Sequence, residues 1–281
     1  MRDLNYWKRK VINAIMTAIV ALSALLAIGL LFVILGYVLF QGITALNLDF
    51  LTQLPKPVGE SGGGMANAIV GTLILVALAC AFSLPIGILA GVYLAEFGRN
   101  RLGTVIRFVA DVLTGIPSIA IGIFAYALIV LPTHSFSAIA GGIALGIIMI
   151  PVVTRSTEEM LLMVPNSLRE ASLALGIPEW RMILRVVVPT AGAGITTGAM
   201  LAVARAAGET APLLFTAFGN RYWQSDLWHP IAALPLQVFT YAISPYDDWQ
   251  AQAWAGALVL VTLVLLMSIA ARFISRNRNI I

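Results

Sequence analysis

The sequence is poor in charge and in cysteine. Only 11% of its 281 residues are charged, whereas 60% are hydrophobic, and the mean hydropathy is +0.94. A soluble domain keeps about a quarter of its residues charged. Because so few charged groups cannot cover a surface that is exposed to water on all sides, lipid must be the main solvent. The single cysteine, Cys80, excludes an intrachain disulfide, and we expect it to be an ordinary core residue.

Lysine is also scarce, and the positions of the few lysines exclude a P-loop for ATP. A P-loop needs Gly-Lys followed by Ser or Thr, and none of the lysines, Lys8, Lys10 and Lys56, follows a glycine. Without a Walker A motif we expect no enzyme and no bound cofactor, so any energy must come from a partner or an ion gradient. His134 and His229 lie far apart, and no metal site is predicted.

Six apolar runs are each long enough to cross a membrane, which takes about 20 residues. They lie at residues 11–40, 67–95, 104–131, 137–153, 186–215 and 251–273. The first run is far longer than the core of a cleavable signal peptide. We therefore predict an all-α membrane protein with six transmembrane helices, in which residues 1–10 precede a single transmembrane domain at 11–281.

Basic residues are concentrated in every second connection between these runs. Fourteen of the 17 lysines and arginines lie at the N-terminus, in the second-to-third and fourth-to-fifth connections and at their edges, or at the C-terminal end. The other connections hold only Lys56 and Arg221. Because basic loops stay on the cytoplasmic side, we expect both termini to be cytoplasmic. Residues 218–250 are rich in Trp and Tyr, which is typical of the lipid–water boundary; a docking surface is the alternative.

Two opposite charges lie inside the fifth run. Arg205 and Glu209 are four residues apart and would share a helix face. A charge near the bilayer centre costs about 3 kcal/mol, which favours a functional role over packing. Pro212 leaves the carbonyl of Gly208 without a partner, so we expect a helix bend there. We interpret these features as a polar site on a pathway; a structural ion pair is the alternative.

Arg205 has suitable chemistry for an oxyanion such as phosphate. Its guanidinium offers planar, bidentate donors and stays charged, and Glu209 would neutralise it when the pathway is empty. Asp111 and Arg155 are further pathway candidates. Asp111 can instead pair with Arg107, one helical turn earlier, and reach the cytoplasmic boundary. Arg155 can instead be a topology anchor.

The connection at residues 165–189 predicts two short helices. Ser167 and Glu170 have the form of a capping box. Gly176 suits a left-handed helix end, and Pro178 suits the first turn of the next helix. Such a helix can insert into a groove on a partner or lie on the membrane surface, and the pattern leaves both open.

The same connection resembles the EAA loop of ABC importer permeases, whose pattern is E-A-A-x3-G-x9-I-x-L-P. The spacing matches throughout, and the departures, Ser172, Val186 and Val188, are conservative in size. The resemblance implies the MetI-like fold of type I ABC importers. It also implies that the loop couples the chain to an ATPase through Ser167, Glu170, Ala171, Gly176 and Pro178.

Longer stretches resemble the PstA family of phosphate-importer permeases. They lie at residues 62–68, 91–96, 117–119, 164–171, 204–215 and 253–256, and the stretch at 204–215 is the most specific. The resemblance implies a multi-pass permease of the bacterial inner membrane and passage of phosphate beside Arg205. The implied partners are a PstC-like permease, a PstB-like ATPase dimer that uses ATP and Mg, and a periplasmic PstS-like phosphate-binding protein.

Three alternatives stay open. Sulfate and molybdate permeases share the EAA loop, and one arginine does not separate tetrahedral oxyanions. A secondary transporter driven by an ion gradient would use Asp111 and Glu209 as ion sites. A membrane sensor or scaffold would need no transport at all.

Overall fold

The computed structural model describes residues 2–60 and 62–278, with side chains described over 6–60 and 62–273. Residues 1 and 279–281, parts of the expected cytoplasmic ends, therefore lie outside the described residues, and Arg2, Arg276 and Arg278 lie outside the described side chains. The described part is helical, apart from loops and an isolated β-bridge between Phe218 and Ile231. In chain order the elements are α1 (Arg2–Ala45), α2 (Leu48–Thr52), α3 (Ala66–Glu96), α4 (Arg101–Gly115), α5 (Ser118–Ala125), the π-helical turn η1 (Tyr126–Val130), α6 (Leu131–Thr133), α7 (Ala138–Leu162), α8 (Asn166–Ala174), α9 (Glu179–Met182), the π-helical turn η2 (Ile183–Val187), α10 (Val188–Ala207), α11 (Ala211–Thr216), α12 (Leu234–Ala242) and α13 (Asp247–Arg278).

Within the described residues, five helices are long and apolar enough to cross a membrane: α1, α3, α7, the continuous α9–α10 segment, and α13. The helices from α4 to α6 form a sixth span only if they are taken together, and they are bent by 105°. A continuous third span over residues 104–131 was therefore a wrong prediction. The bend occurs because Pro117 disfavours a helical conformation at Ile116, whose φ of −72° and ψ of 133° are extended.

The centre of the molecule is the pair α3 and α7, which pack closely along their length. Glycine makes this possible. A Cβ atom on Gly91 would lie 2.6 Å from Cβ of Thr157, and one on Gly87 would lie 2.8 Å from Cβ of Val153. Small residues of this kind let membrane helices approach closely. α10 packs against α7 as well, so the three helices share one apolar core.

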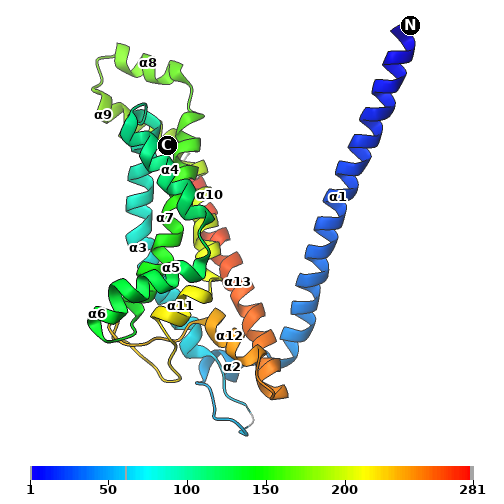
Figure 1. Ribbon diagram of the computed structural model, residues 1–281, viewed down its shortest axis with the longest axis vertical. Coiled ribbons are helices and arrows are strands. Elements are labelled where there is room, and N and C mark those ends of the chain that lie inside the picture. Colours follow the sequence, from blue (N-terminus) through cyan, green and yellow to red (C-terminus); the bar gives the residue numbers. More distant parts are fainter. Residues whose placement is uncertain (1, 61, 279–281) are drawn as a thin grey trace.

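α1 stands away from this body (Figure 1). It packs against α13 at its C-terminal end, where a Cβ atom on Gly42 would meet the carbonyl oxygen of Trp254 at 2.8 Å. The start of α1 and the end of α13 lie at the end of the molecule that carries α8 and α9 (Figure 1). This placement agrees with the prediction that both termini share one side; which side of the membrane that is stays a prediction.

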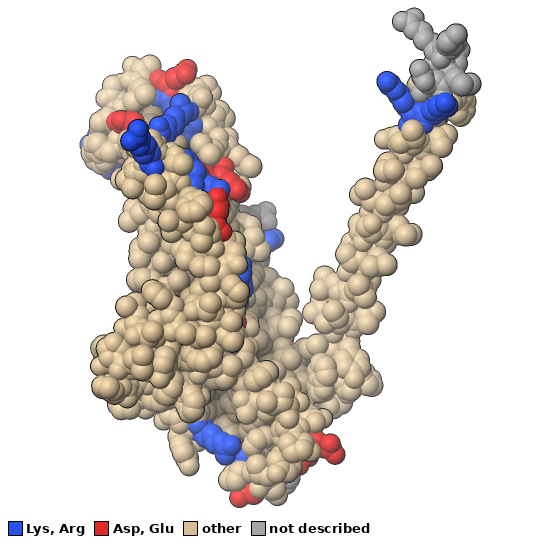
Figure 2. Space-filling model, in the orientation of Figure 1, with Lys and Arg blue, Asp and Glu red and all other residues tan. Residues whose placement is uncertain are grey.

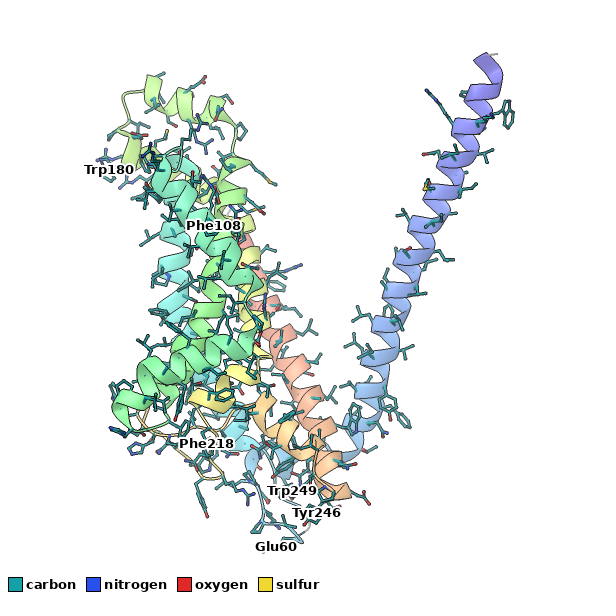
Figure 3. All side chains as sticks on the ribbon, viewed as in Figure 1. Glu60, Phe108, Trp180, Phe218, Tyr246 and Trp249 are labelled. Carbon is teal, nitrogen blue, oxygen red and sulfur yellow. The ribbon has the colours of Figure 1, made fainter. Side chains whose placement is uncertain are left out.

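Charge is distributed as a membrane protein requires. Most charged side chains on the visible face gather at its two ends, and a broad band with few charged side chains separates them (Figure 2). Phe218, Tyr246 and Trp249 lie at the end opposite Trp180 of α9 (Figure 3). Tyr and Trp are enriched where a protein crosses the lipid–water boundary.

Candidate functional site

The first candidate site lies where α10 ends. Arg205 occupies the last turn of α10, and Glu209 lies in the break that follows. Nε of Arg205 is 3.5 Å from Oε1 of Glu209, so the pair expected from their spacing is formed. The Arg205 side chain is 47% exposed and that of Glu209 is 16% exposed. No other acceptor for the Arg205 side chain is found among the described residues, so most of its guanidinium donors have no partner within the described part of the chain.

The expected bend at this site is a complete break in the helix. α10 ends at Ala207 with Gly208 as its C-cap, and α11 begins at Ala211 with Pro212 in its first turn. A fifth span reaching residue 215 was therefore a wrong prediction. α11 instead lies against α5, where a Cβ atom on Gly122 would come within 2.6 Å of Cα of Pro212.

The second candidate site is a chain of charges between α4 and α7. Arg155 pairs with Asp111, with Nε 3.0 Å from Oδ1, and with Glu158, with Nη1 2.9 Å from Oε2. Arg107 donates from Nε to Oε1 of Glu158 at 2.6 Å. The alternative in which Asp111 pairs with Arg107 is therefore wrong. Arg107 and Asp111 pair with residues of α7 and not with each other, because α7 packs against α4 and presents Glu158 to Arg107 and Arg155 to Asp111.

Glu158 was missed in the sequence. Its side chain is only 4% exposed although it is charged. The fourth apolar run was taken to end at residue 153, whereas α7 continues to Leu162. Arg155 and Glu158 are three residues apart and share a helix face, and this spacing was the signal that could have identified the pair.

The two candidate sites are separate. No ion pair or hydrogen bond in the described part of the chain joins Asp111 or Arg155 to Arg205 or Glu209. The structure therefore brings the predicted pathway residues together as two pairs and not as one cluster.

The loop expected to couple to an ATPase forms two short helices, α8 and α9. Gly176 has φ +74°, which confirms the left-handed helix end, and Pro178 directly precedes α9. The capping box was a wrong prediction: α8 starts at Asn166, its N-cap is Pro165, and no side chain caps it. Ser167 therefore lies inside the first turn. It is exposed, as are Glu170 and Ala171.

A cavity of about 260 Å³ lies between α11 and α12. Arg221, Gln237 and Tyr241 are among its lining residues, and none of the predicted site residues lines it. Among the described residues, no group of three or more His, Cys, Asp or Glu side chains is placed to hold a metal ion.

Comparison with known families identifies the architecture. A family model described as the inner membrane component of binding-protein-dependent transport systems matches residues 83–279. The chain belongs to this family. It is therefore a multi-pass membrane component of an ABC transporter and not the catalytic subunit.

Curated relatives of the family cover almost the whole chain. A protein of Xylella fastidiosa named phosphate transport system permease protein PstA is 48% identical, over 97% of this chain and 96% of its own length. Proteins of the same name from Yersinia pestis and Haemophilus influenzae are 46% and 42% identical over 99% of this chain, and over 94% and 99% of their own lengths. The resemblance to the PstA family is confirmed.

A solved structure shares the fold. A chain of the MetNI methionine ABC transporter, in an inward-facing conformation, aligns with a TM-score of 0.63 at 20% sequence identity. The alignment covers 76% of this chain and 97% of that chain. The all-α fold of ABC importer permeases, expected from the EAA loop, is confirmed.

Proposed function

We infer that this chain is the permease subunit of an ATP-driven phosphate importer. The observation that carries the inference is the identity of 42% to 48% to phosphate transport system permease proteins over 97% or more of the chain. We place the protein in the bacterial inner membrane with both termini in the cytoplasm. The alternation of basic residues and the common placement of α8, α9 and the two chain ends support this orientation.

Arg205 is our candidate for the group past which phosphate crosses. Nearly half of its side chain is exposed, and contact of a guanidinium with lipid tails would be costly. The exposed face of Arg205 must therefore meet a water-filled path or a second permease. Its free donors suit phosphate oxygens. Glu209, held beside it by the break after α10, neutralises the guanidinium between passages, so that the anion does not stay bound.

Asp111 and Arg155 are proposed as secondary pathway groups near the end of the molecule that carries α8 and α9. Their side chains are 57% and 35% exposed, so both can meet water. Glu158, which is buried, holds Arg155 from the other side. Arg155 would therefore offer an anion fewer free donors than Arg205 does.

The proposed partners follow from the family and from exposed surfaces. The second half of the pathway is a PstC-like permease, and a PstS-like protein delivers phosphate from the periplasm. A PstB-like ATPase dimer, which uses ATP and Mg, docks on α8 and α9. Leu175 and Trp180 support this docking, because they are 81% and 58% exposed at the end of the molecule that the ATPase would meet.

The proposed mechanism is alternating access. ATP closes the ATPase dimer, α8 and α9 carry that movement into the membrane, and the α10 helices of the two permeases part toward the periplasm. Phosphate then crosses beside Arg205. The chain itself supplies the path and the coupling surface, and its partners supply the energy.

Uptake of labelled phosphate by vesicles that hold the whole complex tests this function. We expect uptake to require ATP and to exceed sulfate uptake. Arg205→Ala should lower it at least about 100-fold with assembly intact, because two charge-assisted hydrogen bonds of roughly 1.5 kcal/mol or more each are lost. Arg101→Ala is the matched control, since Arg101 is exposed and lies at the start of α4.

Three results would contradict these assignments. Normal uptake by Arg205→Ala would remove Arg205 from the pathway. Equal uptake of sulfate and phosphate would refute the substrate. Uptake that continues without ATP and collapses with the ion gradient would establish a secondary transporter instead.

A further inference from the structure

Arg169 of α8 is held by an unusual number of acceptors. Its Nη2 donates to Oε1 of Glu96 at 2.8 Å, and its Nε donates to Oε2 of Glu96 at 3.3 Å. Nη1 also donates to the carbonyl oxygen of Val164 at 2.6 Å, and Nη2 to that of Leu161 at 2.9 Å. A longer contact of 3.4 Å joins Nη1 to Oδ1 of Asn166. One guanidinium therefore joins α8 to the last residue of α3 and to the end of α7.

The contact between Arg169 and Glu96 is largely shielded from solvent, whereas several leucines of the same loop are exposed. The side chains of Arg169 and Glu96 are only 16% and 8% exposed. Leu168, Leu173 and Leu175, on or just after the same short helix, are 40%, 48% and 81% exposed. A bidentate pair fixes both the distance and the angle between its partners. The pair thus sets the direction of α8 against the membrane helices.

Arg169 bonds to the ends of α3 and α7, the two helices with the most extensive packing among the described residues. α3 and α7 meet through glycines, and Leu161 lies one turn beyond Glu158, which holds α4 through Arg107. Arg107 also donates to the carbonyl oxygen of Leu94 at 2.9 Å, near the same end of α3. A displacement of α8 therefore reaches α3, α7 and α4 through short polar contacts and not through flexible chain.

We propose that Arg169 and Glu96 are a positioning pair that transmits movement between α8 and the body formed by α3 and α7. The proposal rests on the proposed function, because it supposes that an ATPase moves α8. It assigns the transmission step to one pair that is 73 residues apart in the sequence. The competing possibility is that the pair only keeps the loop folded, so that the ATPase can bind.

The test uses the whole complex in lipid and measures three quantities: retained ATPase subunit, the ratio of ATP hydrolysis with and without phosphate-loaded binding protein, and phosphate uptake. We expect Arg169→Gln and Glu96→Gln to keep the ATPase bound. Both should lower the stimulation ratio and the uptake at least 10-fold. Arg169→Lys should be intermediate, because lysine keeps the charge but not the bidentate geometry. Arg99→Gln is the matched control, since Arg99 is exposed and three residues from Glu96.

A covalent link separates transmission from folding. In a Cys80→Ser background, Glu96→Cys with Arg169→Cys should be uncoupled, and a short bismaleimide that joins the two thiols should restore the stimulation ratio. A maleimide with one reactive group should not restore it. Restoration by both reagents, or by neither, would overturn the proposal.

The remaining outcomes are also decisive. Loss of the ATPase subunit in Arg169→Gln and Glu96→Gln would show that the pair is needed for docking. A stimulation ratio of ATP hydrolysis equal to that of Arg99→Gln would show that the pair has no role in coupling. Either result overturns the proposal and leaves the transport function intact. Failure of the unmodified complex to take up phosphate with ATP would instead refute the proposed function.

Discussion

Removing the carboxylate of Glu158 is the most direct test of how this membrane body is held together. Glu158 lies on α7 and accepts hydrogen bonds from Arg107 at 2.6 Å and from Arg155 at 2.9 Å. Its side chain is 4% exposed. Glu158→Ala would leave two guanidinium groups facing each other across the space that the carboxylate had filled.

The expected loss follows from this geometry. Removing one partner of a buried ion pair costs about 3 to 5 kcal/mol. Arg107 and Arg155 are 30% and 35% exposed and keep other acceptors, so solvent screens part of the loss. We therefore expect about 3 kcal/mol for Glu158→Ala. Glu158→Gln should cost roughly 1.5 kcal/mol, because the amide keeps one acceptor oxygen.

Thermal denaturation of the purified complex in lipid nanodiscs measures this loss. At roughly 2 to 4 °C per kcal/mol, Glu158→Ala should lower the midpoint by about 6 to 12 °C. Glu159→Ala is the control, because Glu159 is the next residue on the same helix and is exposed. Equal midpoints for Glu158→Ala and Glu159→Ala would refute the view that this buried carboxylate holds α4 to α7.

Two further predictions concern the loops. Gly176 has φ +74°, so Gly176→Val should strain the backbone just after α8 by about 1 to 2 kcal/mol and weaken co-purification of the ATPase subunit. Gly176→Asn should have a milder effect. Undiminished co-purification with the Gly176→Val variant would contradict this prediction. The backbone N–H of Trp228 and then the imidazole of His229 hold the pKa of Asp226 below its ordinary value. Because the folded-state pKa is lowered, the stabilisation is present above the ordinary carboxyl pKa and is lost as pH falls through the lowered value. Hydrogen exchange at residues 226–229 should therefore accelerate, beyond its intrinsic pH dependence, only in acid, and Asp226→Asn should remove that step; an acceleration already present near neutral pH would contradict the assignment.

Much of the architecture could be predicted because it depends on local composition. Apolar runs predicted the spanning helices α1, α3, α7 and α13 to within several residues at most of their ends, because a helix in lipid needs a minimum apolar length. Gly176 was assigned correctly, since a left-handed helix end is a property of one residue. Whether each apolar run forms one continuous helix was harder to predict. Pro117 and Pro212 were visible in the sequence, but how far each would turn the chain depended on what α5 and α11 pack against.

By itself, the sequence determined that this protein lies in lipid, that basic residues alternate between its connections, and that Arg205 and Glu209 pair, because each of these follows from composition or from one helical turn. Only the tertiary structure decided that Arg107 faces Glu158, 51 residues away, and that Arg169 grips Glu96, 73 residues away. The physical reason is that a buried charge pairs with whichever opposite charge the packing of separate helices brings within hydrogen-bonding distance. That choice is made between helices, and the spacing of residues within one helix does not contain it.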